Sequence, residues 1–173
     1  MRKIRYCVAM SLDGYIAGPN GEADWIVMDP DIDFMSVFSQ FDTFLLGRKT
    51  FEWMVKNGQG GSSPGTKTLV FSKTLRQSDY AEVTIVADHA EKILSELRAQ
   101  SGKDIWLFGG GGLFRSLLAL GCVDTVEVSV VPVLLGGGIP LLPALAKQAK
   151  LKLTGHKVYP KSGIVSLEYE VRG

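Results

Sequence analysis

The sequence has only two cysteines and two histidines among its 173 residues. Cys7 and Cys122 lie far apart, without a CxxC pair or a His-rich segment nearby, so the sequence indicates neither a disulfide framework nor a metal site. It also lacks a run of 18 apolar residues, and its basic N-terminus meets Asp13 too early for a signal peptide. These absences predict a cytoplasmic protein that does not enter a membrane.

An excess of charge is missing as well. The 19 Lys and Arg residues nearly balance the 18 Asp and Glu residues, which leaves a net charge of +1 and no global attraction to nucleic acid or an anionic membrane. With 46% apolar residues, a chain of this length suits one compact domain over residues 1–173 that buries about two thirds of its unfolded surface. Any site for an anion must therefore be local.

Apolar strands alternate with helical patterns early in the sequence, and strands cluster late. The segments that read as strands are 4–10, 15–17, 43–46, 68–71, 83–86, 105–108, 125–131, 152–159 and 164–171. The segments that read as helices include 31–40, 50–56 and 113–120. A further helix would begin at a capping box formed by Asp88 and Glu91. This order predicts an α/β fold with a mixed central sheet that ends in an antiparallel hairpin.

Three strand ends carry an unusual set of residues. Gly47, Arg48, Lys49 and Thr50 follow one strand, Ser72 and Lys73 follow another, and four glycines at 109–112 follow a third. Each has a plain structural explanation, since Gly47 could simply end a strand and the cations could be solvated. The three segments should meet where the strands of one sheet end. Glycines there allow close backbone approach, and helix N-termini and cations attract anions, so the segments together predict a site for a ligand with several phosphates.

The standard nucleotide fingerprints do not fit these segments. GxxxxGK[ST] is absent, and GxGxxG starting at Gly109 fails because residue 114 is Phe. A hydroxyl and a cation at Ser72 and Lys73 suit a ribose 2′-phosphate better than the acidic residue typical of NAD sites. The pattern therefore favours NADPH.

Four motifs in a fixed order resemble the dihydrofolate reductase superfamily. They are AMSLDGYIA at 9–17, LGRKTFE at 46–52, FSK at 71–73 and FGGG at 108–111. Within the superfamily, the chain most resembles the C-terminal reductase domain of the bifunctional riboflavin-biosynthesis deaminase/reductase. The deaminase half with its zinc signature is missing.

The resemblance implies a three-layer dihydrofolate-reductase-like fold with helices on both faces of the sheet. It also implies an NADPH-dependent oxidoreductase like 5-amino-6-(5-phosphoribosylamino)uracil reductase, acting on a small heterocyclic or ribosylamine-type substrate. The alternatives are a dihydrofolate or pterin reductase and a nucleotide-binding module without catalysis. Ala9 and Ile16 would border the nicotinamide, and Ser72 with Lys73 would face the 2′-phosphate. The pyrophosphate and its ribose would be held by Gly47, Arg48, Lys49, Thr50, Gly109, Gly110, Gly111, Gly112 and Leu113.

The reduced product needs a proton, and the candidates are Asp13, Asp24, Asp31 or a water that one of them orients. Asp29, Asp31 and Asp33 cluster where dihydrofolate reductases carry the acid that binds the pterin, without one clear equivalent. Asp31 stands at the matching distance before Leu46 and Gly47, but these acids equally read as first-turn and N-cap residues of the next helix. Asp13 also reads as the turn residue of an Asp-Gly pair. The long loop at 18–30, which contains Trp25, is the expected lid.

A homodimer is the expected assembly. Val126, Val128 and Val130 alternate on one strand, and the apolar sequence continues through 131–140. By similarity to the riboflavin-type branch, this region would form the dimer surface; the alternative is that it lies inside the domain.

Overall fold

The computed structural model describes residues 1–59, 64–144 and 148–172. Its strands are β1 (Ile4–Ser11), β2 (Tyr15–Ala17), β3 (Phe41–Gly47), β4 (Lys67–Phe71), β5 (Thr84–Val86), β6 (Asp104–Gly109), β7 (Thr125–Val131), β8 (Ile139–Pro140), β9 (Lys150–Tyr159) and β10 (Ile164–Arg172). The helices are α1 (Phe34–Phe38), α2 (Arg48–Lys56), α3 (Ala90–Ala99) and α4 (Gly111–Ala119), with a 3-10 turn at Gln77–Asp79.

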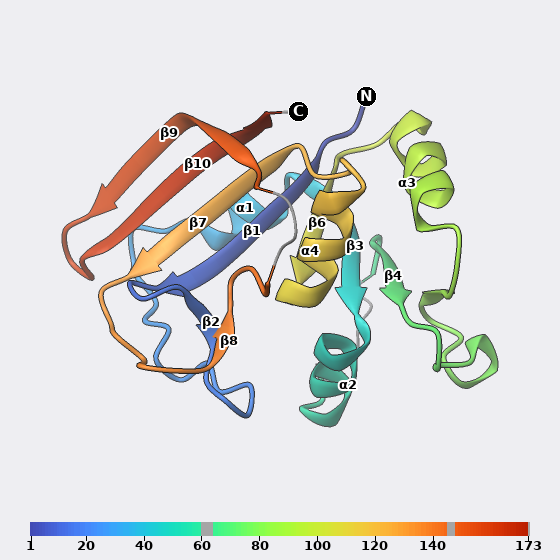
Figure 1. The fold of residues 1–173 in the computed structure, drawn as a ribbon, viewed down its shortest axis with the longest axis horizontal. Helices are drawn as coiled ribbons and strands as arrows, with labels where there is room; N and C mark the ends of the chain where they lie inside the picture. The colour runs from blue at the N-terminus through green and yellow to red at the C-terminus, as the bar shows by residue number, and fades with distance from the viewer. Residues whose placement is uncertain (60–63, 145–147, 173) are drawn as a thin grey trace.

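Eight strands form one sheet in the order β5-β4-β3-β6-β1-β7-β10-β9 (Figure 1). The strands from β5 to β7 in this order pair in parallel, while β10 runs antiparallel to β7 and to β9. β2 and β8 make a separate two-stranded sheet. The predicted mixed sheet with an antiparallel C-terminal hairpin is therefore confirmed.

Helices cover both faces of this sheet. On one face, α3 and α4 bury residues such as Leu94 and Phe114 against the core, and the Phe114 ring stacks on Tyr6 with a centroid distance of 3.9 Å. On the other face, Phe51 of α2 packs with Leu46 and Val70, which alternate with the first set along their strands. This is the expected three-layer arrangement.

The helix predicted at 31–40 is wrong in length, because only Phe34–Phe38 is helical. Asp33 is its N-cap, and its side chain accepts a hydrogen bond from the backbone N–H of Ser36. Asp31, the predicted first residue, lies before the helix, and its backbone N–H donates to the carboxylate of Asp29. The apolar spacing did not mark a buried helix face, since Met35 and Phe38 are 79% and 44% exposed. Local Asp bonds also compete with the first helical turn.

The starts of three further helices also differ from expectation. α2 begins at Arg48 and α4 at Gly111, each two residues before the predicted start. The first turns contain cations and glycines, which an apolar pattern cannot detect. The capping box at Asp88 is wrong, because the N-cap of α3 is His89 in a left-handed conformation (φ 58°) without a side-chain cap bond. The stretch 57–65, rich in Gly, Ser and Pro, is expected to form a loop, and its residues 60–63 lie outside the described residues.

The helices in the described part of the chain are short. The longest, α3, has 10 residues, and none is long and apolar enough to cross a membrane.

The fold predicts a clear contrast between two leucines. Leu45 is fully buried at the centre of the sheet, whereas the Leu120 side chain is 44% exposed after α4. Leu45→Ala should lower the free energy of unfolding by about 2 to 5 kcal/mol, because it removes buried surface and leaves a cavity. Leu120→Ala should cost about 1 kcal/mol or less. Urea unfolding followed by circular dichroism measures both, and equal losses would contradict the assigned core.

Candidate functional site

Two helix N-termini meet at the carboxyl edge of β3 and β6. Gly47 is the N-cap of α2 and Gly110 the N-cap of α4, and neither forms a side-chain cap bond. A Cβ placed on Gly47 would lie 3.5 Å from the carbonyl oxygen of Gly109, and one on Gly110 would lie 3.4 Å from Oγ1 of Thr50. The segments that the sequence analysis grouped are thus brought together, with two sets of uncapped amides suited to an anion.

The four consecutive glycines at 109–112 differ in backbone conformation and in the space available for a side chain. Gly109 has φ 141°, and the peptide bond that joins it to Gly110 is cis. A Cβ on Gly111 would come within 2.7 Å of the carbonyl oxygen of Pro140, in the segment that crosses the start of α4. Gly112 is exposed, and a Cβ there would meet nothing within 4 Å. Gly111 therefore serves packing, a role that the sequence analysis did not assign.

A turn after β4 lies beside the start of α2. Arg48 donates from Nη1 to Oγ1 of Thr74 at 3.2 Å, which ties the two segments. Ser72 is buried, and its Oγ accepts from the backbone N–H groups of Thr74 and Leu75 at 3.2 and 3.1 Å. Ser72 thus orders the turn, while the exposed Lys73, Lys49 and Arg48 supply the positive charge.

A row of polar side chains lies beside Ala9 on the sheet face that carries Trp106. Ala9 pairs with Ser129 in register, and Ser129 pairs with Ser166, with 3.1 Å between the two hydroxyl oxygens. Cys7 and Ala9 point to the same face because strand side chains alternate. Sequence analysis did not single out these serines, since neither stands in a motif.

The next row of this face holds a bidentate ion pair. Arg5 donates to both carboxylate oxygens of Glu127 at 2.7 and 2.8 Å, and Thr125 and Cys7 donate to the same carboxylate. Burial opposes the charge on Glu127, but the hydrogen bonds from Arg5 and Thr125 still lower its pKa. Burial raises the pKa of the Cys7 thiol, with the Glu127 charge adding to the effect. Glu127 is therefore an ionised group already fully engaged within the protein.

Asp13 holds two loops together. Its carboxylate accepts from Oγ of Ser11 at 2.7 Å and from the backbone N–H groups of Leu135 and Gly136 at 3.1 and 2.7 Å. The bond from Ser11 is the main cause that lowers the pKa of Asp13. Gly14, with φ 91°, completes the turn expected of an Asp-Gly pair.

Asp31 and its neighbour Asp29 contact the tip of the β9–β10 hairpin. Asp31 is exposed and forms an ion pair with Lys161 at 2.8 Å. Asp29 is buried, and its carboxylate accepts from the backbone N–H groups of Asp31 and Ser162. The bonds from Ser162 are the main cause that lowers the pKa of Asp29. Asp29 belongs to the predicted acidic cluster, but it was not a candidate proton donor, because only burial distinguishes it from its acidic neighbours.

The remaining candidates lie on the segment between β1 and α1. Ile16 belongs to β2, which pairs with β8, and Asp24 is exposed in a turn of the following loop. Nε1 of Trp25 donates to the carbonyl oxygen of Glu22 within that loop. A Cβ on Gly21 would lie 3.6 Å from Trp53, so the loop reaches α2 at one point and the hairpin tip at another. The loop therefore runs from α2 to the hairpin tip.

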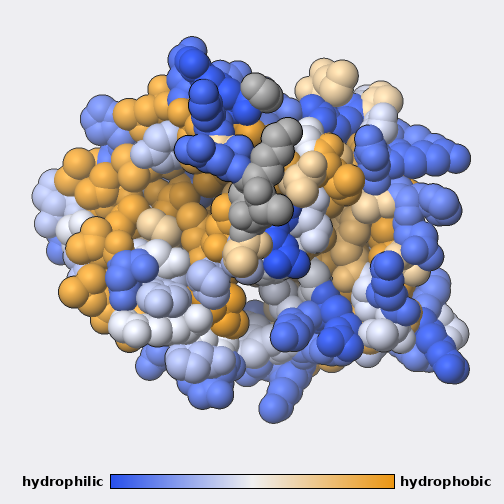
Figure 2. Space-filling model, viewed as in Figure 1, coloured by the Kyte–Doolittle hydropathy of each residue, from blue (hydrophilic) through white to orange (hydrophobic). Residues whose placement is uncertain are grey.

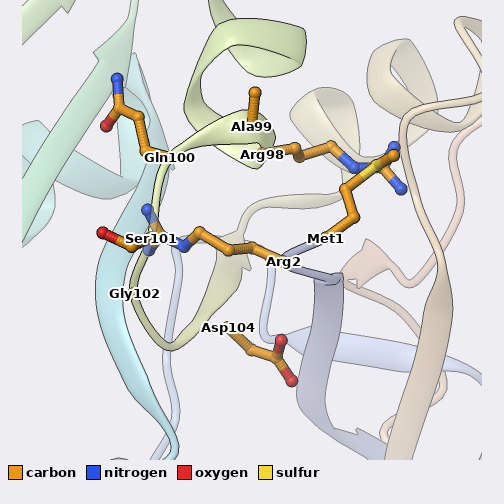
Figure 3. A pocket seen from close by; sticks show the side chains of 8 residues that line it. All are labelled: Met1, Arg2, Arg98, Ala99, Gln100, Ser101, Gly102 and Asp104. Atoms are coloured by element: carbon orange, nitrogen blue, oxygen red, sulfur yellow. The ribbon is translucent and has the colours of Figure 1, made fainter.

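A pocket of about 550 Å³ lies at the opposite edge of the sheet, around the first residues of β1 and β6 (Figure 3). Arg2 in this pocket forms an ion pair with Asp42, and Arg98 pairs with Asp124 at 2.7 Å. Within the described residues, no group of three or more His, Cys, Asp or Glu side chains could hold a metal ion.

Two neighbouring glycines provide a test of this geometry. Gly111→Ala should destabilise the protein by about 1 to 3 kcal/mol, because the new Cβ overlaps the backbone of the segment at Pro140. Gly112→Ala, one position further in the same helix turn, should be neutral or stabilise by up to about 1 kcal/mol. Thermal unfolding of both variants measures this, and the reverse order would disprove the contact with α4.

The lowered pKa values predict a loss of stability in acid. The unfolded chain protonates Asp13 and Asp29 near their ordinary pKa of 3.8. Because the folded pKa values lie lower, these carboxylates stabilise the fold above that value, and their contribution is lost as the pH falls through the folded values. The urea midpoint of the unmodified protein should fall as the pH is lowered below about 3.8. The fall should be less steep in Asp29→Asn, which lacks one of the two carboxylates. An equal slope in both proteins would contradict the anchoring role of Asp29.

The chain is similar to known proteins in sequence and in fold. The chain is 36% identical over 183 residues to the uncharacterized protein YyaP of Bacillus subtilis, covering 99% of this chain and 96% of that protein. Its fold matches a protein described as a riboflavin biosynthesis protein from Shewanella sp. PV-4 (TM-score 0.82, 26% identity, 100% of both chains). It also matches dihydrofolate reductase from Enterococcus faecalis, solved with NADP(H) (TM-score 0.72, 17% identity, 99% and 97% of the two chains), which shows a shared fold. Residues 2–165 match the family described as RibD C-terminal domain, so the chain belongs to that family.

Proposed function

We propose that this protein is a cytoplasmic, NADPH-dependent reductase resembling 5-amino-6-(5-phosphoribosylamino)uracil reductase. It would transfer hydride to a small heterocyclic or ribosylamine-type substrate. The observation that carries the proposal is the meeting of two uncapped helix N-termini, at Gly47 and Gly110, beside the cations Arg48 and Lys73. Membership in the RibD C-terminal domain family supports the same activity.

The residues at this edge fit the phosphates of NADPH. Gly47 and Gly110 have no side chain to block the approach of a pyrophosphate to the amides of α2 and α4. Arg48, held by its bond to Thr74, and the exposed Lys73 would face the 2′-phosphate, and Ser72 would keep their turn in place. NADPH, when bound, supplies the hydride.

The protein's part is to align the substrate with the nicotinamide and to exclude water. Ala9 and Ile16 would border the nicotinamide ring, and the Ser129–Ser166 hydroxyl pair beside Ala9 would receive polar groups of the substrate. The loop at 18–33, held at α2 and at the hairpin tip, would close the site against solvent.

The source of the product's proton follows from which acids are free. Asp13 is engaged by three donors and Asp31 by Lys161, so we assign both a positioning role. Glu127 is occupied by its bonds to Arg5 and Thr125. We therefore propose that the proton comes from a water molecule oriented by Asp24.

Two alternatives remain testable against this function. In a pterin reductase, Asp31 would bind the substrate, and Asp31→Asn would abolish turnover while Lys161→Gln would not. In a nucleotide-binding module without catalysis, NADPH would bind but no pyrimidine, pterin or imine substrate would be reduced. Loss of NADPH absorbance with a ribosylaminopyrimidine, retained in Asp31→Asn, supports the proposed reductase.

Cofactor preference gives a direct test. Lys73→Gln should weaken NADPH binding by about tenfold, equivalent to about 1.4 kcal/mol, and leave NADH binding nearly unchanged, because only NADPH carries the 2′-phosphate. Lys103→Gln, which removes an exposed cation at the opposite edge of the sheet, is the matched control. Titration of intrinsic Trp fluorescence measures the six affinities of the unmodified protein and the two variants for NADPH and NADH. Absence of NADPH binding at millimolar concentration would end the reductase proposal.

A further inference from the structure

Asp29 is the most buried acidic residue that the structure describes, with 2% of its surface exposed. Its two carboxylate oxygens accept one backbone N–H each, from Asp31 at 2.8 Å and from Ser162 at 3.0 Å. Burying a carboxylate costs free energy unless hydrogen bonds compensate for the lost water. An Asn side chain has only one acceptor oxygen, so it could not reproduce both bonds. The carboxylate is therefore suited to holding two segments at once.

The hairpin tip that Asp29 holds is itself fixed to the rest of the domain. The Oγ of Ser162 accepts from the backbone N–H of Ile164 at 3.3 Å, inside the turn between β9 and β10. A Cβ on Gly163 would lie 3.2 Å from the side chain of Pro132, so the tip packs against the segment that follows β7. Asp29 thus ties the chain before α1 to a well-supported point of the sheet.

The same stretch of chain is held at its other end by an aromatic contact. Phe38, the last residue of α1, packs on Trp106 of β6 with 5.0 Å between the ring centroids. Nε1 of Trp106 in turn donates to the carbonyl oxygen of Cys7 at 3.0 Å, in the strand that carries Ala9. Residues 29–38, which we call segment 29–38, are thus anchored at the hairpin tip and at β6.

Segment 29–38 crosses the two strands that lie between its anchors. In the sheet order, β1 and β7 stand between β6 and β10, and Figure 1 shows α1 behind β1 and β7, on the face away from α4. We call Ala9, Ser129 and Ser166, which are neighbours in register on this face, the polar row. A substrate that binds on the polar row would therefore lie against segment 29–38.

The other face of the same strands offers a different surface. Val126 and Val128 of β7, which the sequence placed at a dimer surface, are only 4% and 5% exposed and belong to the core. Figure 2 is seen from this side and shows a broad apolar area where the C-terminal strands lie. Polar groups of a substrate are therefore expected on the face that segment 29–38 crosses.

We propose that Asp29 is a positioning residue, which sets the distance between segment 29–38 and the polar row. The proposal rests on the proposed function, because it takes the polar row as the place where the substrate binds. Asp29 does not touch the reacting atoms, since it is buried and both its oxygens are bonded to amides. Without it, segment 29–38 would move away from the polar row and substrate alignment would suffer. The helix N-termini at Gly47 and Gly110 belong to other segments and would stay in place.

Steady-state kinetics with a ribosylaminopyrimidine test the proposal. Asp29→Asn should lower kcat/KM for this substrate by at least about tenfold, since a small misplacement of a substrate costs much of the rate. The Kd of NADPH should change by less than about twofold, because the phosphate edge is untouched.

Asp124→Asn is the matched control for a general loss of stability. Asp124 also joins separate segments, by accepting from the backbone N–H of Ile4 and from Arg98, but it lies at the opposite edge of the sheet. Its kcat/KM should stay within about twofold of the unmodified protein, with both variants folded by far-UV circular dichroism. Equal losses in the two variants, or parallel losses of turnover and NADPH binding in Asp29→Asn, would show a merely structural role and overturn the proposal.

A double-mutant cycle tests whether the two anchors hold one segment. Once one end of segment 29–38 is released, releasing the other should add little, so Asp29→Asn with Phe38→Ala should lose less kcat/KM than the product of the single losses. Losses that multiply would overturn the proposal. If Asp29→Asn does not fold, Phe38→Ala alone has to show the same pattern, with kcat/KM lowered and NADPH binding kept, and the opposite result would overturn it.

Hydrogen exchange measures the positioning without any turnover. The amide of Ser162 donates to Asp29, and the amide of Val37 donates to the carbonyl oxygen of Asp33 within α1. Both should exchange at least about tenfold faster in Asp29→Asn and at an unchanged rate in Asp124→Asn. An unchanged rate at Val37 in Asp29→Asn would overturn the proposal. Faster exchange together with an unmodified protein that reduces no ribosylaminopyrimidine would instead refute the proposed function and support the anchoring by Asp29.

Discussion

The close approach of two backbones at the ends of β3 and β6 is the constraint on which the candidate site depends. These strands are neighbours in the sheet, and each ends at the glycine N-cap of a helix or one residue before it. Side chains at Gly47 and Gly110 would fill the space between the helix starts. Since helix N-termini attract anions only where their amides can be reached, the missing side chains make the edge usable.

Carboxylates fix the loops around this edge. Asp13 binds the segment after β7, and Asp29 binds the hairpin tip, in each case by accepting backbone N–H groups. Loops far apart in sequence are thereby joined without a metal ion or a disulfide in the described part of the chain. An acid near a proposed site is therefore not by itself a catalytic group, because its lone pairs can already be occupied by backbone donors.

Much of the fold and of the candidate site could be predicted from the sequence. Apolar runs, glycines and the four motifs are local signals, and they predicted the succession of strands and helices, the mixed sheet with its C-terminal hairpin and the grouping of Gly47 with Gly109. The environment of Asp29 could not be predicted, because its partner Ser162 is 133 residues away. For the same reason, the packing role of Gly111 against Pro140 and the polar row at Ser129 and Ser166 required coordinates.

The ion pair between Arg5 and Glu127 limits how this protein family can diverge. Both side chains are 17% exposed, and loss of either one would leave the other charged in a poorly solvated place. A substitution at one of the two positions would therefore lower the free energy of unfolding, while a joint replacement by two apolar residues would not. We expect the two positions to change together or not at all across relatives, and the thiol at Cys7, which also donates to Glu127, to follow them.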